Sequence, residues 1–283
     1  MVDLGWQWDP SLYAGSASYY VRGRVAYPRA LIDAVVDELR LDGTGRLLDI
    51  GCGPGSLTLP LAGWFEHATG LDADADMLAE AARQAELAYV ENVTWIRMQA
   101  EELCAELGPY RVATLAQSFH WMDRARVARA VHGVIEPGGV VVHVHATTHE
   151  GGDTRAPLPH PRPPRHDIGE LIESFLGSRR RAGRSILPDT AATEAEVGRR
   201  EAEIYRAAGF GDPTRLEIPG TVVDRTDDDV VASVFSLSSA APHLFGERVD
   251  EFEATLRRLL ARTSPDGRFS EQLREIAIDI WRT

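Results

Sequence analysis

A glycine-rich turn after an apolar run constrains this chain more than any other feature. The run Leu47-Leu48-Asp49-Ile50 leads into Gly51-Cys52-Gly53-Pro54-Gly55-Ser56, which has glycine at every second position. A short apolar run that ends in such a turn predicts a buried parallel strand followed by a helix. The sequence therefore predicts the first strand–helix unit of a doubly wound α/β sheet, with a ligand lying against the backbone of Gly51 and Gly53.

The other residues of the turn indicate which ligand it accepts. A dinucleotide fingerprint needs a third glycine at position 56 or 58, where the chain has Ser56 and Thr58. Pro54 removes a backbone N–H donor that a pyrophosphate would use, and the Asp49 carboxylate would repel phosphate. The turn therefore favours a ligand that carries an ammonium group.

This arrangement resembles motif I of the class I methyltransferases that use S-adenosylmethionine (SAM). In that family the acidic residue, here Asp49, helps to hold the amino-acid end of the cofactor. Asp72 ends the next predicted strand, about 20 residues beyond the turn, where Rossmann-like sites hold ribose hydroxyls. We expect Asp72 to bind the ribose, and Asp74 or Asp76 to cap the helix that follows.

Two further stretches resemble segments that contact SAM in this family. Tyr20 to Pro28 is similar to the pattern Y-x-x-G-R-P-x-Y-P, with Val25 at the place of the first proline, and the resemblance implies that Tyr20 and Arg24 lie near the carboxylate or sulfonium of SAM. Packing of these two side chains within the fold is the alternative.

The second stretch is Gln99 to Leu103, after a predicted strand over residues 93–98. The resemblance implies that the Ala100 N–H and the Glu101 carboxylate meet the adenine edge. An acidic first turn of a helix would explain the same residues without a ligand.

Gln117-Ser118-Phe119-His120-Trp121-Met122-Asp123 follows a predicted strand over residues 112–116 and resembles the A-Q-S-F/A-H-W-x-D sequence of the family. Reactive ligands lie beyond the carboxyl ends of the strands in such sheets. The resemblance implies that the main chain at Gln117 borders the methionine part of SAM, and that Phe119 to Trp121 form a wall of the acceptor pocket. His120 is a candidate base, or else a structural histidine beside Trp121. His149, after the next strand, is a further candidate for the acceptor pocket.

His143 and His145 are two apart in a predicted strand over residues 140–146, so they lie on one face. No carboxylate or third ligand stands at a recognisable distance along the chain. We therefore expect no metal site.

Composition limits the partners. The formal net charge of -13 argues against a nucleic-acid partner, whose phosphates require lysine and arginine, and favours a small-molecule acceptor. No apolar run approaches the roughly 20 residues of a membrane span, and no signal sequence is evident, which predicts a cytoplasmic protein without a membrane partner. The sequence leaves open whether the chain is a monomer or a homodimer.

The expected fold is a Rossmann-like, mostly parallel seven-stranded sheet with an antiparallel edge formed by residues 214–223 and 275–281. Prolines between residues 151 and 165 predict a long loop, and the arginines between 179 and 184 predict a solvated face, or else a lid that binds an anionic acceptor. The expected parts are an aromatic N-terminal lid (1–27), the SAM-binding core (28–150), a proline- and arginine-rich insertion (151–190), and the end of the core sheet (191–283) with a helical cap at about 225–265 that covers the carboxyl ends of the strands.

The resemblance as a whole implies transfer of the SAM methyl group to oxygen or nitrogen of a small metabolite, with specialised natural products as one setting. The chain lacks the Asn/Asp-Pro-Pro-Tyr loop of many methylases of planar nitrogens, and no cysteine stands where a covalent pyrimidine methylase needs one. Two alternatives remain: a non-catalytic protein that binds SAM or a partner, and an NAD(P)-dependent oxidoreductase.

Overall fold

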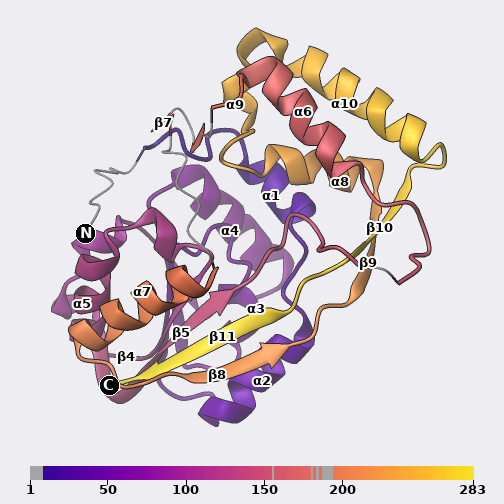
Figure 1. Cartoon of the computed structure of the whole chain (residues 1–283). Helices are drawn as coiled ribbons and strands as arrows, with labels where there is room; N and C mark the ends of the chain where they lie inside the picture. The colour runs from indigo at the N-terminus through magenta and orange to yellow at the C-terminus, as the bar shows by residue number, and fades with distance from the viewer. Residues whose placement is uncertain (1–8, 155, 180, 183–184, 187–193) are drawn as a thin grey trace. The chain divides into compact units, whose positions relative to one another are not determined.

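The computed structural model of the chain describes residues 9–154, 156–179, 181–182, 185–186 and 194–283 (Figure 1). Trp6 and Trp8, part of the expected aromatic lid, lie outside these residues, as do Arg180 and Arg184 of the arginine cluster. The chain divides into two compact units. The helical unit is drawn from within residues 9–26, 147–186 and 219–274, and the sheet unit from 27–146, 194–218 and 275–283.

A seven-stranded sheet forms the middle of the sheet unit, with strand order β3-β2-β1-β4-β5-β11-β8. The pairs from β3 to β5 are parallel, and β11 is antiparallel to both β5 and β8. The expected fold class is therefore confirmed. The strands are β1 Arg46–Ile50, β2 His67–Asp72, β3 Val93–Arg97, β4 Tyr110–Ala116, β5 Ile135–His145, β8 Thr214–Ile218 and β11 Ile276–Arg282.

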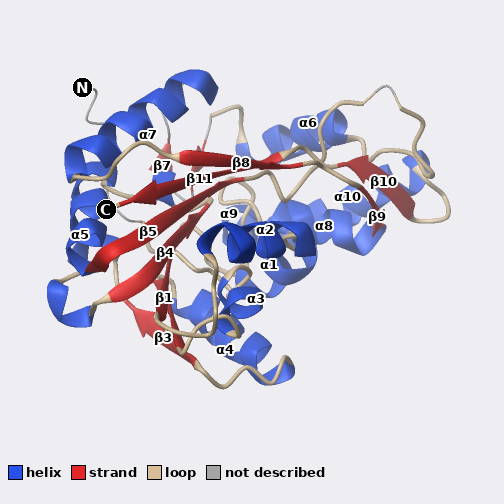
Figure 2. Cartoon of the chain, turned by 90° about the horizontal axis from the view of Figure 1, so that it is seen from below, coloured by secondary structure: helices blue, strands red, loops and turns tan. Residues whose placement is uncertain are grey.

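Helices cover both faces of the sheet (Figure 2), and alternate residues of β1 pack on opposite faces. Leu47 of β1 belongs to the apolar core under α2 and α3, whereas Leu48 belongs to the core under α5 and α7. Burial on both faces explains why β1 is apolar at consecutive positions. The helices are α2 Arg29–Leu39, α3 Thr58–Ala62, α4 Ala75–Leu87, α5 Arg124–Val134 and α7 Glu194–Ala208.

The topology places a switch point between β1 and β4. From β1 the chain moves outward to β2 and β3, then returns to β4 on the other side of β1 and continues outward to β5. Ligands of doubly wound sheets lie beyond the carboxyl ends of the strands at such a point. The turn after β1 and the segment after β4 are therefore the two parts of the chain that should meet a ligand.

The helical unit is held together by apolar helix faces and by ion pairs. Its core contains Phe235, Phe245, Phe252 and Phe269. The Glu271 carboxylate lies 2.8 Å from Arg165 and 3.1 Å from Arg225. The elements are α1 Ala17–Gly23, α6 Arg165–Leu176, β6 Arg181–Ala182, β7 Ser185–Ile186, β9 Val222–Thr226, α8 Asp227–Phe235, α9 Pro242–Phe245, α10 Val249–Thr263 and β10 Arg268–Gln272, and β9 pairs with β10 antiparallel.

One expectation about strands needs correction. The strand expected over residues 214–223 ends at Ile218, because the next residue is Pro219, which has no N–H to donate to a neighbouring strand. The following residues form β9, which pairs with β10 and not with the sheet. The proline-rich stretch is a loop as expected up to Pro164, after which α6 begins.

The contact between α1 and α8 offers a test of the helical unit. A Cβ on Gly23 would lie 2.3 Å from the Ala232 carbonyl oxygen. We expect Gly23→Ala to lower the free energy of unfolding by about 1–3 kcal/mol, because backbone must move to admit the methyl group. Urea unfolding measures the change.

Gly169→Ala is the matched control. Gly169 lies in α6, and a Cβ there would have no neighbour within 4 Å. This variant should be neutral or more stable by about 0.5–1 kcal/mol, since alanine favours helix over glycine. Equal stability of the two variants would contradict the close packing of α1 on α8.

Candidate functional site

The turn after β1 requires glycine for two different reasons. Gly51 has a φ of +67°, and a Cβ there would lie 2.4 Å from the Cβ of Ser118 in the segment after β4. Gly53 has a φ of +52°, with no atom within 4 Å of a Cβ. Gly51 therefore allows the two loops to touch, while Gly53 leaves backbone open to a ligand.

Asp49 lies beneath this turn and is only 1% exposed. Its carboxylate accepts hydrogen bonds from the Thr58 hydroxyl (2.6 Å) and the Thr114 hydroxyl (2.7 Å). Burial raises the pKa of Asp49. Both oxygens are engaged inside the sheet unit, where they join β1, the start of α3 and β4, and the cofactor contact expected of Asp49 stays a prediction.

Asp72 ends β2 and holds the glycine turn in place. One carboxylate oxygen accepts from the Gly53 N–H (2.8 Å) and the other from the Asp74 N–H (2.9 Å). Burial raises the pKa of Asp72 from 3.8 to about 6. Asp74 caps α4 by accepting from the N–H groups of Asp76 and Met77. Each carboxylate oxygen can accept a second hydrogen bond, so Asp72 can also receive ligand hydroxyls.

The segment after β3 also reaches the edge where the strands end. Ala100 is buried at the start of a short 3₁₀ helix, and Glu101 is partly exposed. The Glu101 carboxylate accepts from the Asp123 N–H (2.7 Å), next to α5. Its expected adenine contact stays a prediction, and the structure adds a role in joining this segment to α5.

The segment after β4 begins with a strained residue. Gln117 has a φ of +57°, which is rare for a residue with a side chain and is often found at functional sites. Its amide nitrogen donates to the Tyr27 hydroxyl (3.0 Å), and the next residue, Ser118, donates from its hydroxyl to the Ile50 carbonyl (2.6 Å). The loops after β1 and β4 are therefore bonded as well as packed.

The three residues expected to wall an acceptor pocket divide into two kinds. Phe119 is 1% exposed, with its ring stacked on Tyr205 (centroids 5.2 Å apart) and edge-on to His143 (5.3 Å). His120 is exposed, and its ring centroid lies 4.6 Å from that of Trp121. Phe119 thus supports this segment from the core, while His120 and Trp121 are the side chains available to an acceptor.

Three other expected site residues come together in the helical unit. The Arg24 guanidinium donates to the Ser236 hydroxyl and carbonyl (2.8 Å each), lies 3.4 Å from His149 Nδ1, and stands over the Tyr20 ring (4.8 Å). Burial and the neighbouring Arg24 lower the pKa of His149 to about 3, so this imidazole is neutral near pH 7. Tyr20, Arg24 and His149 form one cluster.

A family model matches part of the sheet unit. Residues 47–139, which carry β1 to β4, the glycine turn, Asp72 and the segment after β4, match the model described as "Methyltransferase domain". The chain contains a class I methyltransferase domain. The methyltransferase domain implies SAM as the cofactor.

Relatives of the methyltransferase domain agree with this family. Uncharacterized methyltransferase Rv3342 of Mycobacterium tuberculosis is 35% identical over 133 residues, 46% of this chain and 51% of that protein. A ubiquinone biosynthesis O-methyltransferase of Pseudomonas aeruginosa is 36% identical over 98 residues, 34% of this chain and 42% of that protein. The chain thus spans about half the length or less of these curated relatives.

A solved structure shows the same fold. The YcgJ protein of Bacillus aligns with 90% of this chain and 99% of its own, at a TM-score of 0.51 and 16% identity. At this identity the likeness shows the fold alone.

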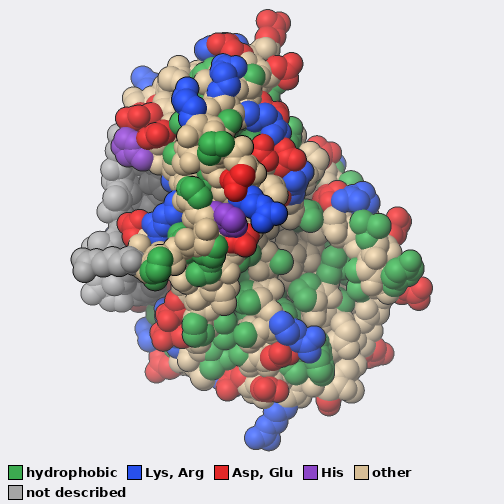
Figure 3. Space-filling model, turned by 90° about the vertical axis from the view of Figure 1, so that its right-hand side faces the viewer, with side chains coloured by type: hydrophobic (Ala, Val, Ile, Leu, Met, Phe, Trp, Pro, Cys, Tyr) green, Lys and Arg blue, Asp and Glu red, His purple; other side chains and the backbone are tan. Residues whose placement is uncertain are grey.

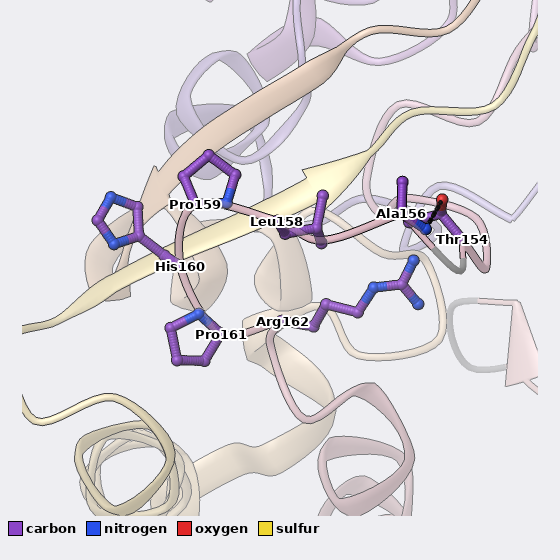
Figure 4. A pocket seen from close by; sticks show the side chains of 7 residues that line it. All are labelled: Thr154, Ala156, Leu158, Pro159, His160, Pro161 and Arg162. Atoms are coloured by element: carbon purple, nitrogen blue, oxygen red, sulfur yellow. Dashed lines mark hydrogen bonds between the residues drawn. The ribbon is translucent and has the colours of Figure 1, made fainter.

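The surface supplies little further guidance. Acidic and basic side chains are interspersed on the face in Figure 3. In the helical unit, the proline-rich loop from Thr154 to Arg162 borders a hollow that is open to solvent (Figure 4). A neighbouring cavity of about 330 Å³ is lined partly by Arg162, Arg165, Arg274 and Glu271.

Among the helices that the structure describes, none combines the length and apolar character of a membrane span.

The structure also brings together residues that the sequence analysis left unconnected. Glu201 of α7 and Asp279 of β11 lie beside His143 and His145 of β5. The two histidines were visible as a pair in the sequence. The carboxylates of Glu201 and Asp279 were not, because both residues are far from the histidines along the chain.

The pKa of Asp72 gives a test of the cofactor edge of the methyltransferase domain. The raised pKa means that the Asp72 carboxyl binds a proton more tightly in the folded chain than in the unfolded chain. Protonated Asp72 therefore stabilises the fold most below its ordinary pKa of 3.8, and this stabilisation is lost as the pH rises through about 6. We expect the free energy of unfolding of wild type relative to Asp72→Asn to fall by about 1–2 kcal/mol between about pH 4 and about pH 7. Denaturant unfolding of both proteins at several pH values measures this change. A difference in unfolding free energy that does not vary with pH would contradict the raised pKa of Asp72.

Proposed function

We propose that the chain is a SAM-dependent methyltransferase that transfers a methyl group to oxygen or nitrogen of a small-molecule acceptor, with specialised metabolism as its setting. The observation that carries the proposal is the contact of the glycine turn after β1 with the segment after β4, at the switch point of a methyltransferase domain. Next in the same turn, Gly53 donates its N–H to the Asp72 carboxylate and has open space where a Cβ would lie.

The residues at this edge fit the cofactor. Asp72 would receive the ribose hydroxyls, since its carboxylate already lies at the end of β2 against the turn. Ala100 and Glu101 would meet the adenine edge, and the main chain at Gln117 would border the methionine part. Tyr20 and Arg24, which form a cation–π pair in the helical unit, would meet the carboxylate or sulfonium.

The chemistry requires little of the protein beyond positioning. Bound SAM supplies an electrophilic methyl group, and holding an acceptor in line with it provides much of the rate. A base is needed only where the acceptor must first lose a proton. His120 is the candidate, because its side chain is exposed beside Trp121 in the segment after β4.

Two observations support a small acceptor. The formal net charge is -13, which disfavours a polyanion as the acceptor. One relative is a ubiquinone biosynthesis O-methyltransferase, whose printed name gives oxygen as its acceptor atom. The alternative of a non-catalytic SAM-binding protein is distinguished by turnover, and that of an NAD(P)-dependent oxidoreductase by cofactor preference.

Cofactor binding is the first test. We expect calorimetric titration to show binding of SAM and S-adenosylhomocysteine to wild type, and a loss of affinity of about 10–100-fold in Asp72→Ala, since hydrogen bonds to a charged group contribute about 1.5–3 kcal/mol. Asp76→Ala, which removes an exposed carboxylate of α4, is the control and should bind as wild type. Binding of NADH but not SAM would overturn the proposal.

Turnover is the second test. With methyl-labelled SAM and a fractionated lysate, we expect label in the small-molecule fraction. His120→Ala should lower the rate by about 100-fold or more while SAM binding is kept, as expected of a base. If the label enters RNA or protein alone, the acceptor class is wrong. If His120→Ala turns over normally, His120 is not the base.

A further inference from the structure

A cluster of metal-ligand side chains lies inside the sheet unit, on the face of the sheet that α5 and α7 cover. His143 and His145 project from β5 on this face, with ring centroids 4.2 Å apart. The Nδ1 atoms of both rings lie 3.9 Å from Oε2 of Glu201, which comes from α7. Two imidazole nitrogens and one carboxylate oxygen therefore point at one small volume.

One oxygen of the Glu201 carboxylate lacks a hydrogen-bond partner among the described residues. Glu201 is 5% exposed, and its Oε2 is buried without a hydrogen-bond partner among the residues that the structure describes. At 3.9 Å the two imidazoles are too far away to donate to it. A buried carboxylate oxygen without a partner is costly, and a cation is one way to satisfy it.

One of the two histidines is buried together with the carboxylate. His143 is 4% exposed, so its ring lies inside the core beside Glu201. An imidazole binds a metal through the lone pair of a ring nitrogen.

An outer carboxylate orients the second ring. His145 Nε2 lies 3.1 Å from Asp279 of β11, and the Asp279 carboxylate is in turn 3.2 Å from Arg215. A proton on Nε2 donates to Asp279 and leaves the Nδ1 lone pair facing Glu201. This arrangement of carboxylate, histidine and ligand site is the one that commonly supports protein-bound zinc.

We propose that His143, His145 and Glu201 form a binding site for a divalent transition-metal ion of the zinc class, with Asp279 as the outer carboxylate. In a tetrahedral site with bonds of about 2.0–2.1 Å, ligand atoms lie roughly 3.3 Å apart. The three side chains would therefore move closer together on binding, since their ligand atoms now lie within 4.8 Å of one another. Two nitrogens and one oxygen suit zinc and similar ions, whereas magnesium and calcium prefer oxygen alone.

The site adjoins the segment assigned to the acceptor. The Phe119 ring lies edge-on to His143, and the next residue along the chain is His120. A metal ion at this position would hold β5 and α7 in fixed relation, next to the ring of Phe119. The proposal is independent of methyl transfer, because it concerns only binding of the ion.

The test uses the purified full-length chain after removal of metal by a chelator. We expect titration with zinc chloride, against a chromogenic zinc chelator, to show one tight site per chain and to raise the midpoint of thermal unfolding. His145→Ala and Glu201→Gln should each weaken binding by at least tenfold, and Asp279→Asn by about 10–100-fold. Magnesium and calcium should not compete.

Two controls separate this site from adventitious binding. Glu203→Gln removes an exposed carboxylate of the same helix, and His166→Ala removes the histidine of an exposed His166, Asp167 and Glu170 group in α6. Both variants should bind zinc as wild type does. Absence of a tight site in wild type, or zinc binding unchanged by His145→Ala and Glu201→Gln, would overturn the proposal.

A spectroscopic measurement keeps the test decisive if a variant is unstable. In wild type, long-range ¹H–¹⁵N correlation spectra of the imidazoles should show metal-induced shifts of Nδ1 in two histidines when zinc is added. Shifts of Nε2, or of other histidines alone, would place the metal elsewhere and overturn the assignment.

Discussion

The buried Asp49 carboxylate connects the elements on which the cofactor edge depends. It accepts one hydroxyl from Thr58, at the start of α3, and one from Thr114, in the middle of β4. The first bond fixes where the helix begins after the glycine turn, and the second fixes β1 against β4. Gly51 and Ser118 can then pack against each other, because the parallel strands β1 and β4 are in register and end close together. Burial raises the pKa of the Asp49 carboxyl, and the hydrogen bonds from the two hydroxyls oppose this shift and make its burial tolerable.

Local patterns predicted most of the sheet unit. The apolar run of β1, the glycines after it and the acid at the end of β2 each describe a neighbourhood of a few residues, and the parallel order follows from alternation of strands and helices. The antiparallel pair of β8 and β11 was also predictable, because Ile276, Ile278 and Ile280 alternate with less apolar residues.

Features that depend on distant partners were not predictable. Nothing in residues 222–226 and 268–272 indicates that they pair, since alternation specifies a strand but not its neighbour. The sequence could not show that Phe119 turns inward onto Tyr205, a residue of another helix. For the same reason the sequence did not reveal that Glu201 of α7 lies beside His143 and His145.

The position of β11 has a consequence for dissecting the molecule. This strand lies between β5 and β8, yet it follows the whole helical unit along the chain. Neither unit is therefore one uninterrupted fragment. A shortened chain that stops before Ile276 would leave β5 and β8 with open hydrogen-bonding edges, and exposed edges of this kind invite pairing with other chains. A minimal version of the sheet unit would have to splice three segments that are separated along the chain by the helical unit.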